Sequence, residues 1–284
     1  MHHAKRSRSK RSPLSKRDPS RPINDTLFQR ARLFLLRNIP KRWTHSPAPR
    51  VLLLPSNLVL KCGRHVSLSE AHTLEFVSKN SHIPVPRVIT AYESESGYRY
   101  ILMSRIRGVP LSSVFGEFSE EKQRNILRQL RNYINELRAL RPPEPGYVGA
   151  VDLTPLHDER VHDGPLGPFN SVQEFHKALR RGFEEKSGHV ELDNMIETEK
   201  TRDYSCRMTH GDLSFRNIIV QGEKLTGIVD WETAGWYPDY WEYASTFYSF
   251  FDSVGLRPRI DEFLDAYPEK RQTEQTRRRL FNMT

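Results

Sequence analysis

Cysteine is nearly absent from this chain, since Cys62 and Cys206 are the only two in 284 residues. Two cysteines so far apart exclude a disulfide framework and a Cys-x-x-Cys metal site. We expect both thiols to be reduced, which indicates an intracellular protein, most simply a cytoplasmic one.

Long apolar runs are absent as well. No segment approaches the roughly 18 consecutive apolar residues that mark a membrane-spanning helix. The amino terminus is basic, but no apolar stretch follows it, so it does not have the form of a secretory signal. We therefore predict a protein without a membrane segment.

Glycine is missing from residues 1–60. Its absence excludes a Gly-x-Gly-x-x-Gly loop in that part of the chain, the kind of segment whose main chain wraps nucleotide phosphates. Any nucleotide site built there must hold the phosphates with side chains or metal ions.

The positive charge is concentrated at one end of the chain. Residues 1–22 hold eight Lys or Arg and one Asp, so they carry +7 of the net +9 and leave 36 basic against 34 acidic residues elsewhere. We predict that 1–22 is a disordered basic tail. Three alternatives stay open: a solvated tail without a partner, a nuclear localisation or nucleic-acid-binding segment, and an organellar transit peptide.

Nucleic acid is nevertheless a poor primary partner for the chain. No aromatic residues alternate with the basic ones, as a platform for stacked bases would need. The second basic cluster, at residues 277–279, is predicted to lie on a frayed terminal helix.

The segment 209–217 reads Thr-His-Gly-Asp-Leu-Ser-Phe-Arg-Asn, and Gly-Ile-Val-Asp-Trp-Glu follows at 227–232. Asp212 and Asn217 have the spacing of a kinase catalytic loop, in which the Asp faces the substrate hydroxyl and the Asn holds magnesium. Residues 217–220 and 225–229 are rich in β-branched side chains, which predicts a hairpin that brings Asn217 beside Asp230. Two oxygen ligands side by side suit Mg²⁺. The alternative is an ordinary surface hairpin with polar ends.

These motifs resemble those of the aminoglycoside phosphotransferase and choline-kinase-like family, and in particular its fungal branch of small-molecule kinases. The resemblance covers roughly residues 50–268. Gly211 is typical of the small-molecule branch, since protein kinases usually have Arg between the His and the Asp. The resemblance implies an α+β, two-lobed protein-kinase-like fold, with a small antiparallel-sheet lobe and a larger, mainly helical lobe.

Within that fold, Lys61 ends the second strand of a hairpin predicted over residues 50–62, where kinases carry the Lys that contacts the phosphates. A helix predicted over 67–78 offers Glu70 as its ion-pair partner, with Glu75 as the other candidate. His210 is predicted to brace the catalytic loop through hydrogen bonds. Ser56 or Asn57, in the turn of the first hairpin, are candidates for replacing the missing glycine loop.

By the same resemblance, the strand that ends near Met103 leads into the segment that contacts adenine, through Ser104, Arg105 and Ile106. We predict the nucleotide-binding lobe over residues 23–105 and the catalytic and substrate lobe over 106–284. A helix beginning after Ser119 is predicted to supply a core-facing stripe up to Leu140.

Two features of the second lobe bear on the acceptor. The acids and histidines of the loop 146–169 resemble a zinc site only superficially, because no helix face presents them together. The aromatic run at 236–243 is predicted to be mainly core. Its two acids, Asp239 and Glu242, are predicted substrate contacts, since acidic and aromatic side chains hold cationic acceptors.

The sequence therefore predicts an ATP- and Mg²⁺-dependent phosphotransferase that moves the γ-phosphoryl group to a hydroxyl of a small molecule. Asp212 is the predicted catalytic residue. The alternative is a catalytically weak nucleotide-binding pseudokinase or scaffold, which the missing glycine loop favours. A protein kinase fits less well, because no activation segment is recognisable. The identity of the acceptor and the oligomeric state stay open.

Overall fold

A computed structural model of the chain describes residues 21–38, 45–48, 50–162, 164–184, 187–247 and 257–281. The predicted disorder of the basic tail concerns residues that lie almost wholly outside these ranges. Among the described helices, none has both the length and the apolar character required to cross a bilayer.

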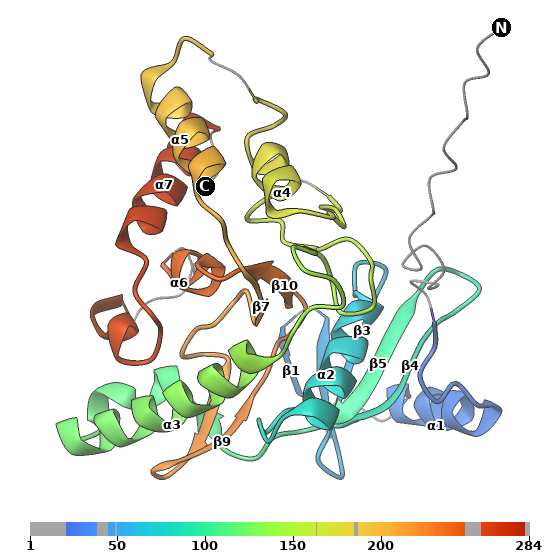
Figure 1. The fold of residues 1–284 in the computed structure, drawn as a ribbon. Coiled ribbons are helices and arrows are strands. Elements are labelled where there is room, and N and C mark those ends of the chain that lie inside the picture. The colour runs from blue at the N-terminus through green and yellow to red at the C-terminus, as the bar shows by residue number, and fades with distance from the viewer. Residues whose placement is uncertain are drawn as a thin grey trace, which may run out of the picture.

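The first lobe is built on a five-stranded antiparallel sheet with the strand order β1-β2-β3-β5-β4 (Figure 1). Its elements are α1 (Leu27–Arg37), β1 (His45–Ala48), β2 (Val51–Leu54), β3 (Leu58–Gly63), α2 (Leu68–Asn80), β4 (Val88–Glu93) and β5 (Arg99–Ser104). The hairpin and the helix that the sequence predicts around Lys61 and Glu70 are confirmed as β2–β3 and α2.

Each face of this sheet is covered by one helix. The side chains of β5 alternate between the two faces and contact both helices. Ile101 and Met103 belong to the core shared with α2, whereas Leu102 packs with Leu33 of α1 on the opposite face. Side chains on a strand point alternately to the two faces, so one apolar strand can serve two cores. Ser67 caps α2 by accepting a hydrogen bond from the Ser69 main-chain nitrogen at 3.3 Å.

The second lobe is mainly helical and contains two small sheets, β10-β7 and β6-β8-β9 (Figure 1). Its elements are β6 (Val109–Pro110), η3 (Leu111–Ser113), η4 (Phe115–Glu117), α3 (Glu120–Ala139), α4 (Val172–Leu179), α5 (Val190–Thr201), β7 (Cys206–Thr209), β8 (Ile218–Gln221), β9 (Lys224–Ile228), β10 (Gly235–Pro238), α6 (Trp241–Thr246), η5 (Arg257–Glu262) and α7 (Pro268–Leu280). The lobe boundary that we placed after residue 105 stays a prediction; β5 ends one residue before it.

Helix α3 forms the support of the catalytic hairpin. Ser119 caps it, as predicted, and its buried stripe of five apolar residues packs against β7 and β9. The predicted hairpin after the catalytic loop is confirmed as β8–β9, with Ile218 opposite Ile228.

The prediction of a frayed terminal helix is wrong. Helix α7 packs against α5 and α6, and Arg277 and Arg278 are buried with their guanidinium groups on Glu274. A run of charged residues is typical of a solvated segment, but here two of the arginines pair with one carboxylate inside the lobe.

A second cluster of buried polar side chains surrounds His176 of α4. Its side chain is 1% exposed, and its Nε2 lies 2.7 Å from the Tyr240 hydroxyl. Burial lowers the pKa of His176 to about 3, and the charges of Lys270 and Arg180 contribute to lowering it from its ordinary value. The imidazole is therefore neutral in the folded protein.

We expect acid to destabilise the protein through this histidine. Between pH 6.5 and pH 3 the unfolded chain binds the proton and the folded chain does not, so the free energy of unfolding falls as the pH falls. Going from about pH 7 to about pH 5 should remove about 2 kcal/mol through this one group. Urea unfolding at the two pH values measures the loss in the wild type and in His176→Phe, which should lack that share. His189→Phe, at an exposed position, is the control and should behave like the wild type; an equal acid loss in His176→Phe would contradict the assignment.

Candidate active site

The catalytic loop, residues 210–217, runs from the end of β7 to the start of β8 and is held from inside the lobe. The carboxylate of Glu242, on α6, accepts hydrogen bonds from the main-chain nitrogens of His210 at 2.6 Å and Gly211 at 3.1 Å. Gly211 has φ +82°, and a Cβ there would lie 2.8 Å from the Thr233 main-chain oxygen. Glycine is therefore required at this position both by conformation and by space.

His210 is fully buried and joins the loop to the segment that directly follows β9. Its Nε2 lies 3.0 Å from the Val229 carbonyl oxygen, and its Nδ1 accepts from the Asp212 main-chain nitrogen at 3.2 Å. Both contacts are satisfied by the tautomer protonated on Nε2. These are the bracing hydrogen bonds that the sequence predicts for this residue.

Asp212 is largely buried, and three side chains hold its carboxylate. Arg160 Nη1 donates to Oδ1 at 2.5 Å, while Arg216 Nη2 and Asn217 Nδ2 donate to Oδ2 at 2.8 and 3.1 Å. Arg160 also donates to the Gly211 carbonyl oxygen and forms a bidentate pair with Asp158. The loop containing Arg160 is thereby tied to the catalytic loop.

The hairpin brings the two predicted metal ligands together. The Val229 main-chain nitrogen donates to the Asn217 carbonyl oxygen at 2.9 Å, which places Asn217 next to Asp230 at the open end of β8–β9. Asp230 has φ +68°, a left-handed conformation that is uncommon for a residue with a side chain. This conformation redirects the chain after β9.

Lys61 links the two lobes through carboxylates from both. Its Nζ lies 2.8 and 2.9 Å from the two oxygens of Glu70 and 2.6 Å from Asp230 Oδ1. The predicted partner is therefore Glu70, whereas Glu75 pairs with Lys79 on the surface of α2 at 3.1 Å.

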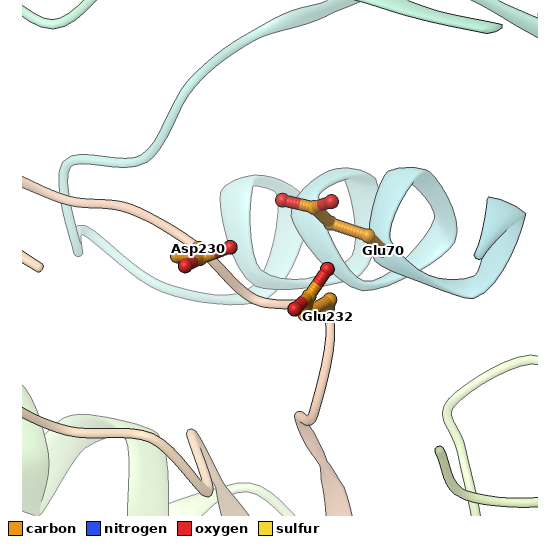
Figure 2. A group of neighbouring side chains, drawn as sticks. All are labelled: Glu70, Asp230 and Glu232. Carbon is orange, nitrogen blue, oxygen red and sulfur yellow. The ribbon is translucent and has the colours of Figure 1, made fainter. Parts of the chain in front are cut away.

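Figure 2 shows three carboxylates gathered at this point: Glu70 on α2, and Asp230 and Glu232 on the segment after β9. Burial raises the pKa of Glu70 to about 7. Burial also opposes the charge on Lys61, but the surrounding carboxylates outweigh it and raise the pKa of the ammonium group. Lys61 in turn holds the pKa of Asp230 below its ordinary value, although burial acts in the opposite direction. The ammonium group is the cation that these carboxylates already share.

A cavity of about 300 Å³ lies between the lobes beside this cluster. Its lining includes the residues predicted to contact the base, to contact the phosphates and to hold the metal: Lys61, Glu70, Met103, Ser104, Arg105, Ile106, Asn217 and Asp230. Apolar side chains that the sequence did not single out complete it, among them Val51, Val59 and Ile219.

Ser56 and Asn57 do not lie where a phosphate clamp is needed. Both have left-handed conformations in the β2–β3 turn, and the Asn57 carbonyl oxygen accepts from the Arg105 main-chain nitrogen at 2.8 Å. The turn is thus at the Arg105 end of the sheet. The turn between β1 and β2 lies at the opposite end, where Val51 pairs with Lys61 and Arg50 precedes the strand.

A second cavity, of about 430 Å³, adjoins the first where Asn217 contacts Asp212. It is lined from the catalytic side by Asp212, Glu232 and Thr233, and from the other side by side chains of the loop 157–165 and of the first lobe. Sequence reasoning missed Arg50 and Arg160 among them, because no motif marks either residue.

Neither predicted substrate contact lines this cavity. Glu242 is 1% exposed, and both of its oxygens are occupied by the catalytic loop. Asp239 accepts from the Ser205 hydroxyl at 2.8 Å and faces a separate depression beside α3. The aromatic residues around them, Trp236 and Trp241, are core, as predicted.

Asn217 and Asp230 provide the donor set that Mg²⁺ takes. Asn217 uses its Nδ2 on Asp212, to the main-chain oxygen at 2.8 Å and the carboxylate at 3.1 Å, which leaves Oδ1 as its ligand atom. The Asp230 side chain is 33% exposed and gives one oxygen to Lys61. An amide oxygen and a carboxylate, completed by phosphate oxygens and water, suit an octahedral magnesium ion. The residues present therefore fit this metal.

The sequence profile of the phosphotransferase enzyme family (APH) matches residues 64–280. This match includes the catalytic loop, the hairpin and α2. The chain therefore belongs to the phosphotransferase enzyme family. A comparison with curated proteins finds no match.

Solved structures with the same fold include aminoglycoside phosphotransferases. Aminoglycoside phosphotransferase APH(4)-Ia aligns with a TM-score of 0.54 at 15% identity, over 90% of this chain and 82% of its own. A ternary complex of a thermostable mutant of that enzyme with AMP-PNP and hygromycin B gives 0.53 at 15%, over 88% and 81%. A GDP and kanamycin complex of a 2″-phosphotransferase gives 0.54 at 14%, over 90% and 89%. At these identities the likeness establishes the fold, the α+β two-lobed fold predicted from the sequence.

Proposed function

We propose that this protein transfers the γ-phosphoryl group of ATP, as its magnesium complex, to a hydroxyl group of a small molecule. The observation that carries the proposal is the position of Lys61. Its ammonium group bridges Glu70 of the first lobe and Asp230 of the second, in a cavity that adjoins the catalytic Asp212.

In this proposal the nucleotide occupies the smaller cavity, with its base beside Met103, Ser104 and Ile106. Lys61 contacts the phosphates, and Glu70 fixes the direction of its side chain. Asn217 and Asp230 hold the magnesium, which neutralises charge on the β- and γ-phosphates when it is bound.

Asp212 orients the acceptor hydroxyl in the larger cavity and accepts its proton. The bond between the acceptor oxygen and the γ-phosphorus forms while the bond from that phosphorus to the β,γ-bridging oxygen breaks, and ADP leaves with the electron pair. Because the transition state of such transfers is loose, proton loss comes late and positioning contributes more than basicity. The contacts of Asp212 with Arg160, Arg216 and Asn217 serve that positioning.

The solved relatives support this assignment in outline. Their complexes hold AMP-PNP or GDP together with an aminoglycoside, hygromycin B or kanamycin. The two adjoining cavities of the present chain match such a pair of ligands, a nucleotide in one and a small molecule in the other.

Calorimetric titration of ATP into the wild-type protein tests the proposal. We expect binding in the micromolar to millimolar range with magnesium, and at least about tenfold weaker binding without it, because Asn217 and Asp230 would then face unneutralised phosphates. The control is a titration with calcium, whose larger coordination sphere should support binding less well. No binding of ATP at millimolar concentration with magnesium would contradict the proposal and favour a scaffold.

A further inference from the structure

The larger cavity is rich in cationic side chains. Its described lining contains five arginines and two histidines, against four carboxylates. The arginines are Arg50, Arg64, Arg99, Arg160 and Arg216. A site for a polycationic acceptor would need more carboxylates than cationic side chains.

Most of the carboxylates in this lining already have a cationic partner or belong to the group around Lys61. Asp158 and Asp212 are held by Arg160, with Arg216 also on Asp212. Glu232 belongs to the acidic group around Lys61. Only one acid of the described lining, the exposed Glu159, lies outside these two groups.

Two of the arginines are not neutralised in this way. Arg64 is exposed, and Arg50 donates to a main-chain carbonyl oxygen, that of His65, at 3.5 Å. Among the described residues, neither lies within ion-pair distance of a carboxylate. Arg64 therefore presents a guanidinium group that is available to a ligand, and Arg50, whose charge also acts on Glu232 at longer range, lines the same cavity.

Arg99, in the same wall of the cavity, is paired with Glu93 at 2.8 Å. One further feature gives this wall a positive potential. Ser67 lines the cavity at the amino terminus of the 13-residue helix α2, the end that carries the partial positive charge of the helix.

We propose that the acceptor is an anionic hydroxyl compound, with a phosphate or carboxylate group bound at Arg64 and Arg50 while its hydroxyl reaches Asp212. This proposal rests on the function proposed above and names the substrate class for the same site. Planar guanidinium groups pair with phosphate and carboxylate in a bidentate manner, which gives direction as well as attraction. An aminoglycoside, which carries several ammonium groups, is repelled by the same side chains.

The test compares three probes by calorimetry at saturating Mg²⁺ and AMP-PNP, so that the nucleotide cavity is filled. The probes are glucose 6-phosphate, glucose and kanamycin. We expect glucose 6-phosphate to bind at least about tenfold more tightly than the other two, and to weaken with added salt as screened charges do. Binding of glucose 6-phosphate no tighter than glucose, or binding of kanamycin as tight as either, overturns the proposal.

Two variants test where the anionic group of the acceptor binds. Arg64→Gln, at an exposed position, should weaken glucose 6-phosphate about tenfold and leave glucose and AMP-PNP unchanged. Arg124→Gln, on the exposed face of α3, is the matched control and should change none of the three. A parallel loss of AMP-PNP affinity in Arg64→Gln would assign this arginine to the nucleotide phosphates and overturn the proposal.

The same titrations separate the two proposals. If AMP-PNP binds and glucose 6-phosphate does not, the phosphotransferase function stands and the anionic acceptor is excluded. If AMP-PNP itself does not bind, the proposed function fails, and titration of glucose 6-phosphate and kanamycin into the nucleotide-free protein still decides the charge preference of the cavity.

Discussion

Asp212→Asn should lower the turnover number by about three orders of magnitude and leave the affinity for magnesium–ATP within about threefold of the wild type. The amide retains the size of the carboxylate but cannot accept the hydroxyl proton. The nucleotide affinity should persist because Asp212 does not line the nucleotide cavity. Turnover is measured as ADP release with the best acceptor found, or with water where no acceptor is supplied.

Asp158→Asn is the control for this variant. Both carboxylates hold Arg160, so a loss that came only from a detached Arg160 would affect the two variants alike. We expect Asp158→Asn to lower turnover by about tenfold, through positioning alone. Equal losses in the two variants would mean that Asp212 serves as an anchor and not as the proton acceptor.

Asp230→Asn should abolish the magnesium dependence of ATP binding and weaken magnesium–ATP at least about a hundredfold. The substitution removes the charged group of the proposed metal site and the second carboxylate of Lys61. Asparagine tolerates the left-handed conformation at φ +68° well, so the backbone should not add a separate loss. Calorimetric titration of ATP with and without magnesium measures both effects.

Glu232→Gln is the matched control, since Glu232 lies in the same group of carboxylates and offers an oxygen within 4.8 Å of the others. It should weaken magnesium–ATP less than about tenfold, because general negative charge is reduced but the proposed ligand remains. Magnesium-dependent binding that survives in Asp230→Asn would remove this residue from the metal site.

The elements that carry the site could be predicted because their signals are local. Two apolar runs separated by a short turn predict the hairpin β2–β3, and two runs rich in β-branched residues predict β8–β9. The helix predicted over 67–78, with Glu70 in its first turn, corresponds to α2. The short hairpin then dictates that Asn217 and Asp230 lie together. The structure decided between Glu70 and Glu75, since the direction in which a helix faces a sheet depends on packing that neighbouring residues do not encode.

The acceptor side could not be predicted in the same way. Arg160 reaches Asp212 across 52 positions of sequence from a loop without periodicity. The sequence predicts Glu242 as a substrate contact, whereas its side chain is buried against the main chain of His210 and Gly211. An acid in an aromatic run can face either a ligand or main-chain nitrogens, and its sequence neighbours are the same in both cases.

The motifs of the catalytic loop and hairpin carry the resemblance that implies the family, the two-lobed fold and the nucleotide-binding set, and the comparisons confirm the family and the fold. The sequence by itself places Asn217 beside Asp230, because a short hairpin acts over a few residues through turn geometry and strand pairing. Only the tertiary structure shows the charge of the larger cavity, the proposed acceptor site. It depends on which arginines already have a carboxylate partner: Arg160 pairs with Asp158 two residues away and with the distant Asp212, whereas Arg64 has no carboxylate partner among the described residues.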